Sequence, residues 1–367
     1  MTRAIALFAL LPVFHLHAAD RARNVILFLG DAGGLPTLHA GSIHAHNHPQ
    51  KLFLFTLPHI ALSETSSASA WVSDSAAGMT AIVTGQKTHN GVLSQSAAAV
   101  RREKDGVALK TLLEYAEERG LLTGLISNDS VTGATPAALY AHSNDRGKTA
   151  EIFRQIIEPR FGDGVDLVIG SGRPAILKAT QAAGMDAEAA LLAKGYQVAN
   201  SLDSLPSNSR RLAVLLDSNR FDLERAVEHA IRTLSKGNKG YFLMVECDVH
   251  TDNIVGGLDR VALLDRVIQR TAQTVNLKDT LILFTADHSF DIRVHSGRKG
   301  EPLLSNEEKA SLDQKQDSVR LKNLRRDDTH TGEQVLVAAT GPGSQRVRGF
   351  LSNTDLFSIL MAAYGWK

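Results

Sequence analysis

The chain has 367 residues, of which 43% are hydrophobic and 22% are charged, as in an ordinary globular protein. Its formal net charge of +1 gives no electrostatic reason to expect nucleic acid or an anionic membrane as a partner. The single cysteine, Cys247, excludes an intramolecular disulfide and a cysteine-rich metal site. The length fits one large α/β domain or two smaller ones.

The first nineteen residues have the pattern of an export signal. Arg3 precedes an apolar run from Ala4 to Leu16, and small residues at Ala18 and Ala19 precede Asp20. The run is shorter than the ~20 residues that a membrane-spanning helix needs. We therefore predict a signal peptide at 1–19, a single domain at 20–367, a periplasmic or secreted location and no membrane association after cleavage. An uncleaved signal anchor is the alternative.

The first half of the chain alternates apolar runs with amphipathic segments. Asn24 to Gly30 is a continuous apolar run, typical of a buried parallel strand, and it leads directly to Asp31. Ser75 follows Asp74 and precedes small residues, which predicts a turn that opens into a helix with Ser75 near its first turn. Further strands are predicted at 122–127, 165–169 and 212–216, and helices at 35–44, 109–119, 147–157 and 223–234. The segment 174–209 has mixed character and is predicted to be peripheral.

The second half contains two further strands that end in acidic residues. Gly240 to Glu246 is one, and Thr280 to Thr285, followed by Asp287 and His288, is the other. A helix is predicted at 258–275, a late strand at 334–339 and a polar surface insertion at 298–326. Strands that alternate with helices predict an α/β fold with a doubly wound, largely parallel central β-sheet flanked by helices. Ligands of such folds bind beyond the carboxyl ends of the strands.

Acidic side chains and an imidazole follow three of these strands. Because the fold brings the carboxyl ends of parallel strands to one edge, we expect Asp31, Glu246 and Asp287 with His288 to lie close together. Carboxylates and imidazole suit Zn²⁺ and similar divalent ions. Carboxylates packed together repel one another, and a divalent ion removes that repulsion. The helix start at Ser75 would favour an anion beside its hydroxyl.

Several motifs resemble the alkaline phosphatase family. They are Asp74-Ser75-Ala76-Ala77-x-x-Thr80-Ala81, Thr285-Ala-Asp287-His288 and His330-Thr-Gly-Glu333, and their order along the chain also matches. The resemblance runs from about Asn24 to the C-terminus. It implies an α/β sheet sandwich, two zinc ions, one magnesium ion and hydrolysis of small-molecule phosphate monoesters through a phosphoserine. Specificity for nucleic acid is not expected.

The resemblance also implies a role for each matching residue. Ser75 resembles the nucleophile, and Arg146, eleven residues after Thr135, resembles the arginine that clamps two phosphate oxygens. The implied metal ligands are Asp31 between zinc and magnesium, Asp287 and His288 on the zinc that activates Ser75, His330 on the other zinc, and Thr135 and Glu246 on magnesium. A zinc ion that binds the serine oxygen would replace a histidine base.

Two places depart from the family pattern. Gly133 stands where the family usually has Asp or His two residues before Thr135, so we expect the magnesium site to be weak, wet or empty. Thr251 and Val255 stand where the family has an Asp and a His on the second zinc. In a shortened arrangement nearby, Asp248 and His250 are the preferred replacements, Asp252 is an alternative, and all three together remain open. Alternate residues at a strand end share a face, which favours Asp248 and His250.

The sequence leaves two alternative functions open. One is a related enzyme that uses the same metals on phosphodiesters, although Ser75 and its local motif favour monoesters. Another is a phosphate-binding protein of this fold with impaired catalysis. A sulfatase is disfavoured because Ser75 is not followed by Pro and Arg. The oligomeric state also stays open, with a homodimer as one outcome. The insertion at 298–326 is expected to shape either substrate entry or a subunit contact.

Overall fold

The computed structural model describes residues 21–203, 205–206, 209–312 and 316–367. The predicted signal peptide therefore lies outside the described residues. The elements up to the middle of the chain are β1 (Asn24–Asp31), α1 (Leu35–His46), η1 (Phe53–Thr56), β2 (His59–Ser63), α2 (Ser75–Thr84), α3 (Leu112–Glu118), β3 (Leu122–Ser130), α4 (Ala134–Tyr140), α5 (Thr149–Ile157), β4 (Leu167–Ser171), α6 (Arg173–Ala182), α7 (Ala187–Ala193), β5 (Gln197–Ala199) and β6 (Leu212–Leu215).

The remaining elements begin with a helix and contain most of the short strands. They are α8 (Leu223–Leu234), β7 (Tyr241–Asp248), α9 (Ile254–Thr274), β8 (Thr280–Thr285), β9 (Ser289–Phe290), β10 (Arg293–Val294), α10 (Asn306–Ser311), β11 (Ser318–Arg320), β12 (Leu324–Asp327), β13 (His330–Thr331), β14 (Val335–Thr340), η2 (Ser344–Arg346), β15 (Gly349–Leu351) and α11 (Asp355–Tyr364). None of the described helices is long and apolar enough to cross a membrane.

A ten-stranded sheet forms the centre of the molecule, in the order β15-β2-β14-β8-β1-β7-β3-β4-β6-β5. The run from β8 to β5 is parallel throughout, as predicted for a doubly wound fold. On the other side, β14 pairs antiparallel with both β8 and β2. The late strand predicted at 334–339 is therefore present, and it closes the parallel part of the sheet.

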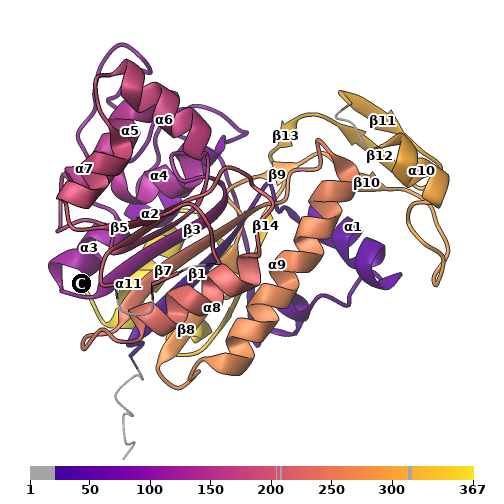
Figure 1. Ribbon diagram of the computed structural model, residues 1–367. Coiled ribbons are helices and arrows are strands. Elements are labelled where there is room, and N and C mark those ends of the chain that lie inside the picture. Colours follow the sequence, from indigo (N-terminus) through magenta and orange to yellow (C-terminus); the bar gives the residue numbers. More distant parts are fainter. Residues whose placement is uncertain (1–20, 204, 207–208, 313–315) are drawn as a thin grey trace, which may run out of the picture.

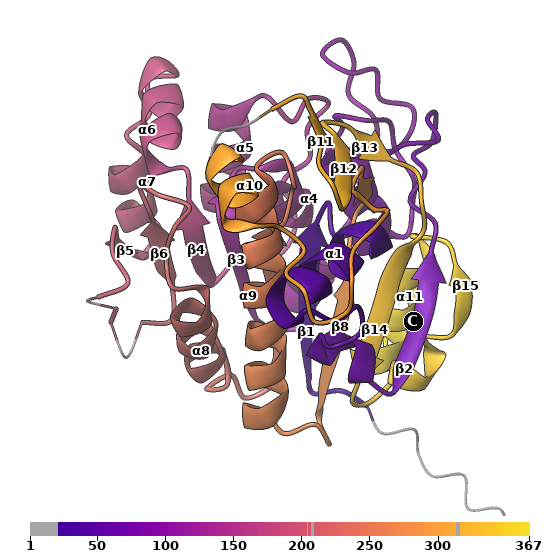
Figure 2. The ribbon, with the colours of Figure 1, turned by 90° about the vertical axis from the view of Figure 1, so that its right-hand side faces the viewer.

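Helices cover both faces of this sheet (Figures 1 and 2). Successive residues of β1 explain why, because Val25 and Leu27 belong to one hydrophobic core and Ile26 and Phe28 to the other. The first core contains residues of α2 to α7 and α11, and the second contains residues of α1, α8 and α9. A strand that is buried on both sides reads as a continuous apolar run, and this is the signal that the sequence carried.

Three predicted segments differ from the structure in extent. The helix predicted at 109–119 spans Leu112–Glu118, because Thr111 and Glu114 form a capping box. The helix predicted at 258–275 begins at Ile254, where the Asn253 side chain accepts a hydrogen bond from Gly256 N–H. The segment 174–209, predicted to be mixed, contains α7, β5 and most of α6. In each case a cap or a tertiary contact decided what the hydrophobic pattern left open.

The segment 298–326, predicted as a polar surface insertion, has both exposed residues and residues buried against the body. It extends from the body beside the carboxyl ends of the strands (Figure 1). Its leucines at 303, 304, 312 and 324 pack with Ile254 and Leu258 of α9 in a third hydrophobic cluster. The Arg326 side chain is fully buried. The sequence did not indicate this packing, because these apolar residues are scattered among charges and follow no regular period.

Candidate active site

The carboxyl ends of β1, β7 and β8 bring the predicted acids together. β1 lies between the other two strands, with Asp31 opposite Asp248 of β7, and Leu29 opposite both Glu246 and Thr285. Asp287 and His288 follow β8 directly. The structure therefore places Asp31, Glu246, Asp287 and His288 at one edge of the sheet, as the strand pattern predicted.

Helix α2 presents Ser75 to this edge. Asp74 is the N-cap residue, and its Oδ1 accepts a hydrogen bond of 3.0 Å from Ala77 N–H, so Ser75 begins the helix. The first turn packs tightly against the loop after β8, since a Cβ on Gly78 would lie only 2.6 Å from the Asp287 carbonyl oxygen. The small residues after Ser75 thus allow the helix start to reach the acidic edge.

The Ser75 hydroxyl lies between a carboxylate and an imidazole. It is 2% exposed, and its Oγ is 3.3 Å from both Asp31 Oδ2 and His288 Nε2. Thr135 Oγ1 donates to the same Asp31 oxygen at 3.2 Å. Asp31 Oδ1 and Asp287 Oδ2 are buried and accept no hydrogen bond. Ligand atoms of Asp31, Asp287 and His288 all lie within 4.8 Å of one another, which suits a divalent ion.

A second group of possible ligands consists of His250, His288 and His330, whose ligand atoms also lie within 4.8 Å of one another. The His288 and His330 rings stack with centroids 3.8 Å apart. Nδ1 of His288 donates to the Ser289 carbonyl, and Nδ1 of His330 donates to the Ser73 carbonyl. In both rings Nε2 is left as the acceptor, and an outer hydrogen bond of this kind fixes the tautomer of a metal-binding histidine.

The two-stranded β9–β13 sheet brings His330 to this group. His330 pairs with Phe290, and Thr331 pairs with Ser289, so the chain after His288 runs antiparallel to the chain at His330. Phe290 is buried, and its ring lies 5.1 Å from that of His250 and 5.9 Å from that of His330. Phe290 could not be singled out from the sequence, because its role depends on this pairing.

The charges of the site change the pKa values of its members. Burial alone would raise the pKa of Asp31, but His250 and His288 outweigh it and hold that pKa well below its usual range. Burial and the Asp31 charge raise the pKa of Asp287 to about 6. Burial would lower the pKa of His250, yet Asp31 and Asp248 raise it to about 9. Burial and the neighbouring His288 lower the pKa of His330 to about 4. His330 is therefore neutral near pH 7, as a metal ligand must be.

The shortened loop after β7 contributes His250 to the histidine group. Asp248 Oδ1 lies 2.7 Å from His250 Nδ1 and orients that ring. Neither Asp248 nor Asp252 belongs to the two groups of ligand atoms found in the described part of the chain. Asp248 thus contacts His250 from outside the histidine group. The Asp252 carbonyl accepts a hydrogen bond from Arg326 of the insertion.

Two arginines hold the backbone of this loop. Arg260 of α9 donates through Nε to the Asp248 carbonyl and through Nη2 to the His250 carbonyl. Arg326 donates through Nη2 to the Asp252 carbonyl at 2.9 Å. Neither arginine was singled out from the sequence, where each looks like an ordinary surface charge. Their positions show how a loop shorter than the family pattern keeps a defined shape.

Arg146 lies at the mouth of the site. Its Nη1 donates to Asp74 Oδ2 at 3.1 Å, and its side chain is 33% exposed. Asp74 therefore caps α2 with one oxygen and holds Arg146 with the other. Among the described residues, the remaining guanidinium nitrogens form no further hydrogen bond or ion pair. An arginine placed beside the start of a helix is suited to bind an anion.

Glu246 and Thr135, predicted as magnesium ligands, also lie close to Asp31. Ser127 donates a short hydrogen bond to Glu246 Oε2. Burial, with the charges of Asp31 and Asp129, raises the pKa of Glu246 well above its usual range. Asp129 at the end of β3 was not predicted as a site residue. Its own pKa is raised, by partial burial of the carboxylate and by Asp248 and Asp31.

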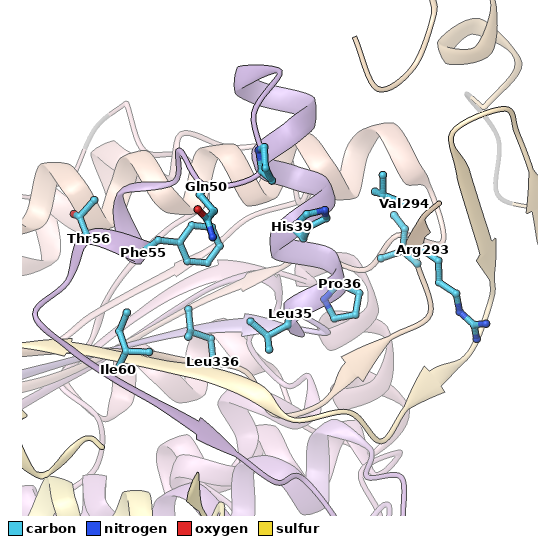
Figure 3. A pocket seen from close by; sticks show the side chains of 12 residues that line it. Leu35, Pro36, His39, Gln50, Phe55, Thr56, Ile60, Arg293, Val294 and Leu336 are labelled. Carbon is cyan, nitrogen blue, oxygen red and sulfur yellow. The ribbon is translucent and has the colours of Figure 1, made fainter. Parts of the chain in front are cut away.

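A hydrophobic hollow lies beside α1 and shares none of these residues. Leu35, Phe55, Ile60 and Leu336 line it, together with the polar side chains of His39 and Arg293 (Figure 3). No Asp or Glu is among the described residues that line it, in contrast to the cluster at the strand ends.

The fold and the strand-end residues define a class of protein: an α/β enzyme with a serine facing a cluster of carboxylates and histidines. The sequence profile of the alkaline phosphatase family matches residues 22–200 and 212–322. The chain belongs to the alkaline phosphatase family, and it is a phosphatase.

Individual relatives agree with this assignment. The chain is 28% identical to the alkaline phosphatase of Escherichia coli (strain K12), with 94% of this chain and 87% of that protein covered. It is 30% identical to the alkaline phosphatase of Gadus morhua over 74% of this chain and 69% of that protein. The alkaline phosphatase of the Antarctic bacterium TAB5 has a similar structure, with a TM-score of 0.77 at 23% identity over 95% and 99% of the two chains. A TAB5 mutant with Mg bound in its M3 site has a TM-score of 0.76, at 22% identity and with the same coverage.

Proposed function

We propose that this phosphatase hydrolyses small-molecule phosphate monoesters through a phosphoserine on Ser75. One observation carries the proposal: the buried Ser75 hydroxyl at the start of α2 lies 3.3 Å from both Asp31 and His288. Helix-start N–H groups and Arg146 can receive the phosphate oxygens on the same side. No histidine–carboxylate pair is arranged as a general base for Ser75 among the described residues, because Nδ1 of His288 donates to the Ser289 carbonyl.

The residues present fit two zinc-type ions. Asp31, Asp287 and His288 would hold one, and the orphaned oxygens of Asp31 and Asp287 support this. His250 and His330 would hold the other, with Asp248 behind His250. Bound there, divalent ions would favour ionisation of the Ser75 hydroxyl and neutralise charge on the leaving oxygen. Thr135 and Glu246 would hold a magnesium-type ion, as a TAB5 relative binds Mg in its M3 site.

The protein's own residues position the ester for in-line displacement. Arg146, held by Asp74, would bind two phosphate oxygens and orient the phosphorus towards Ser75. The Ser75 Oγ–phosphorus bond then forms while the bond from phosphorus to the ester oxygen breaks, and the alcohol leaves with a proton. Water next attacks phosphorus, the bond to Oγ breaks, and inorganic phosphate is released. Phosphoryl transfer needs such positioning and charge stabilisation more than it needs a base.

The test combines turnover with direct detection of the intermediate. Purified protein is assayed on a chromogenic phosphomonoester with zinc and magnesium, and acid-quenched samples are searched by mass spectrometry for phosphate on the Ser75 peptide. Ser75→Ala and chelator treatment should each abolish turnover, and Ser75→Ala should abolish labelling. Thr84→Ala, which removes a buried hydroxyl from the other end of α2, is the matched control. Full activity of Ser75→Ala would refute the mechanism, and tight phosphate binding without turnover would favour the binding-protein alternative.

We also propose export to the periplasm or outside the cell, on the basis of the N-terminal sequence pattern. N-terminal sequencing of the protein from a periplasmic or culture fraction tests this. A mature chain that begins at residue 19 or 20 is the expected result, and a full-length chain found only inside the cell would contradict the proposal.

A further inference from the structure

The loop before α4 packs so closely around Gly133 that it leaves no room for a Cβ atom at this position. A Cβ at this position would lie 2.9 Å from Asp129 Oδ2 and 2.8 Å from the Ser130 carbonyl oxygen. Real Cβ contacts are longer than 3.0 Å, so any larger residue would force a rearrangement. The Asp129 carboxylate therefore lies where a side chain at position 133 would begin, which is where the family usually carries an Asp or a His.

Asp129 is connected to Glu246 by one hydroxyl group. Ser127 Oγ accepts a hydrogen bond of 2.9 Å from Asp129 N–H and donates to Glu246 Oε2. The residue as a whole is exposed, but its carboxylate faces inward, where its close charged neighbours include Asp248, Asp31 and Arg146. The end of β3 thus places an exposed residue, Asp129, close enough to the buried Glu246 for their charges to interact.

The carboxylates of Glu246 and Asp129 have no ion-pair partner among the described residues. Glu246 is 1% exposed, and only its Oε2 accepts a hydrogen bond within the described residues. Neither Glu246 nor Asp129 forms an ion pair with a described lysine, arginine or histidine. A carboxylate that is 1% exposed and lies close to three further acids is costly in its charged form unless a cation binds.

We propose that Asp129 is a ligand of a third cation site and supplies the carboxylate that Gly133 lacks, together with Glu246 and Thr135. The proposal deepens the proposed function and rests on it, because it concerns the same strand-end site. The donors are all oxygen atoms, which favours a hard ion such as Mg²⁺ over zinc. Magnesium commonly keeps several waters and one or two protein carboxylates. An exposed Asp129 opposite a buried Glu246 fits that partial coordination.

The test measures magnesium binding to the full zinc-loaded protein by calorimetry, with zinc content determined separately. Asp129→Asn keeps the size of the side chain and removes its charge, so magnesium should bind at least about tenfold more weakly while the zinc content is unchanged. Asp217→Asn is the matched control, because Asp217 follows β6 at the same edge of the sheet with a 64% exposed side chain. It should bind magnesium like the parent protein.

A second variant separates direct ligation from a general charge effect. Asp129→Cys replaces a hard ligand by a soft one, so cadmium should bind there and give a thiolate-to-cadmium charge-transfer absorption. The buried Cys247 of the parent protein should give none. The proposal is overturned if the parent protein binds no magnesium, if Asp129→Asn binds it unchanged or loses zinc equally, or if Asp129→Cys gives no new absorption.

These outcomes remain distinct from those of the proposed function. Phosphate on Ser75 is measured in the same preparations. Magnesium binding through Asp129 without any phosphoserine would refute the phosphoserine mechanism and leave the third site standing. Phosphoserine formation with magnesium binding that is indifferent to Asp129 would refute the third site alone.

Discussion

Gly257 offers the sharpest test of how the shortened loop positions His250. The residue lies in the first turns of α9, and a Cβ there would lie 2.3 Å from the His250 carbonyl oxygen and 2.9 Å from its carbon. The first distance is 0.7 Å inside the 3.0 Å limit for real Cβ contacts. The atom in the way belongs to the backbone and also accepts a hydrogen bond from Arg260, so it cannot rotate aside. Gly257→Ala should therefore displace His250.

The expected change in stability of Gly257→Ala has two opposing contributions. Alanine favours a helix over glycine by about 1 kcal/mol, whereas overpacking against a rigid neighbour costs about 1–3 kcal/mol. The net loss of stability in Gly257→Ala should thus be modest, about 0–2 kcal/mol. The effect on the site should be larger, because a misplacement of about 1 Å costs on the order of a hundredfold in rate. We expect kcat/KM to fall by at least about tenfold.

The matched control is one residue away. A Cβ on Gly256 would meet the Asn253 and Arg260 side chains at 3.2 and 3.3 Å, outside the 3.0 Å limit, so shifts of a few tenths of an ångström accommodate it. Gly256→Ala should keep or slightly increase stability in urea unfolding and should keep its zinc content and kcat/KM. If Gly257→Ala behaved in the same way, the tight approach of α9 to His250 would have no functional meaning and this reasoning would be wrong.

Three further predictions concern charge and metal. Burial and nearby acids raise the pKa of Glu117 to about 8 from 4.5, so its contribution to stability is complete below pH 4.5 and is lost as pH rises through 8. Glu117→Gln should remove most of this loss, at most about 5 kcal/mol, in urea unfolding measured from pH 5 to 9, and an unchanged slope would contradict it. Chelation should lower the melting temperature by several degrees, since each ion at a hundredfold excess over its dissociation constant stabilises by about 2.7 kcal/mol, and zinc should restore it. Arg146→Lys should lower kcat/KM about ten- to hundredfold, because a lysine cannot reproduce the planar fork, and wild-type kinetics would exclude Arg146 from phosphate binding.

The sequence could predict those parts of the site that depend on one strand at a time. Asp31, Glu246 and Asp287 each follow a continuous apolar run, and a parallel sheet must bring such positions to one edge. Ser75 was predictable for a similar reason, because a capping acid followed by small residues is a local signal. The central parallel order and the helix-covered faces followed from the same alternation.

Other parts depend on contacts that no local pattern encodes. The spacing of Asp248, His250 and Asp252 allowed several ligand sets, and only the chain path puts His250 beside His330 with Asp248 behind it. Asp129 was not predicted, because only the chain path places its carboxylate beside Gly133. β2 was missed because it is short and half-buried at the antiparallel side of the sheet.

The β9–β13 pairing has a consequence for how this enzyme could be modified. Residues 291–329 leave the body at Phe290 and return at His330, and these two residues pair directly. The segment is therefore a closed excursion, and doubling or halving its length changes the closure free energy by only about 0.6 kcal/mol. His288 and His330 can keep their places while the segment is exchanged, provided that the new segment replaces the link from Arg326 to the Asp252 carbonyl and the leucine packing on Ile254 and Leu258. The segment 291–329 is therefore a suitable place to introduce new substrate-recognition surfaces beside an unchanged catalytic centre.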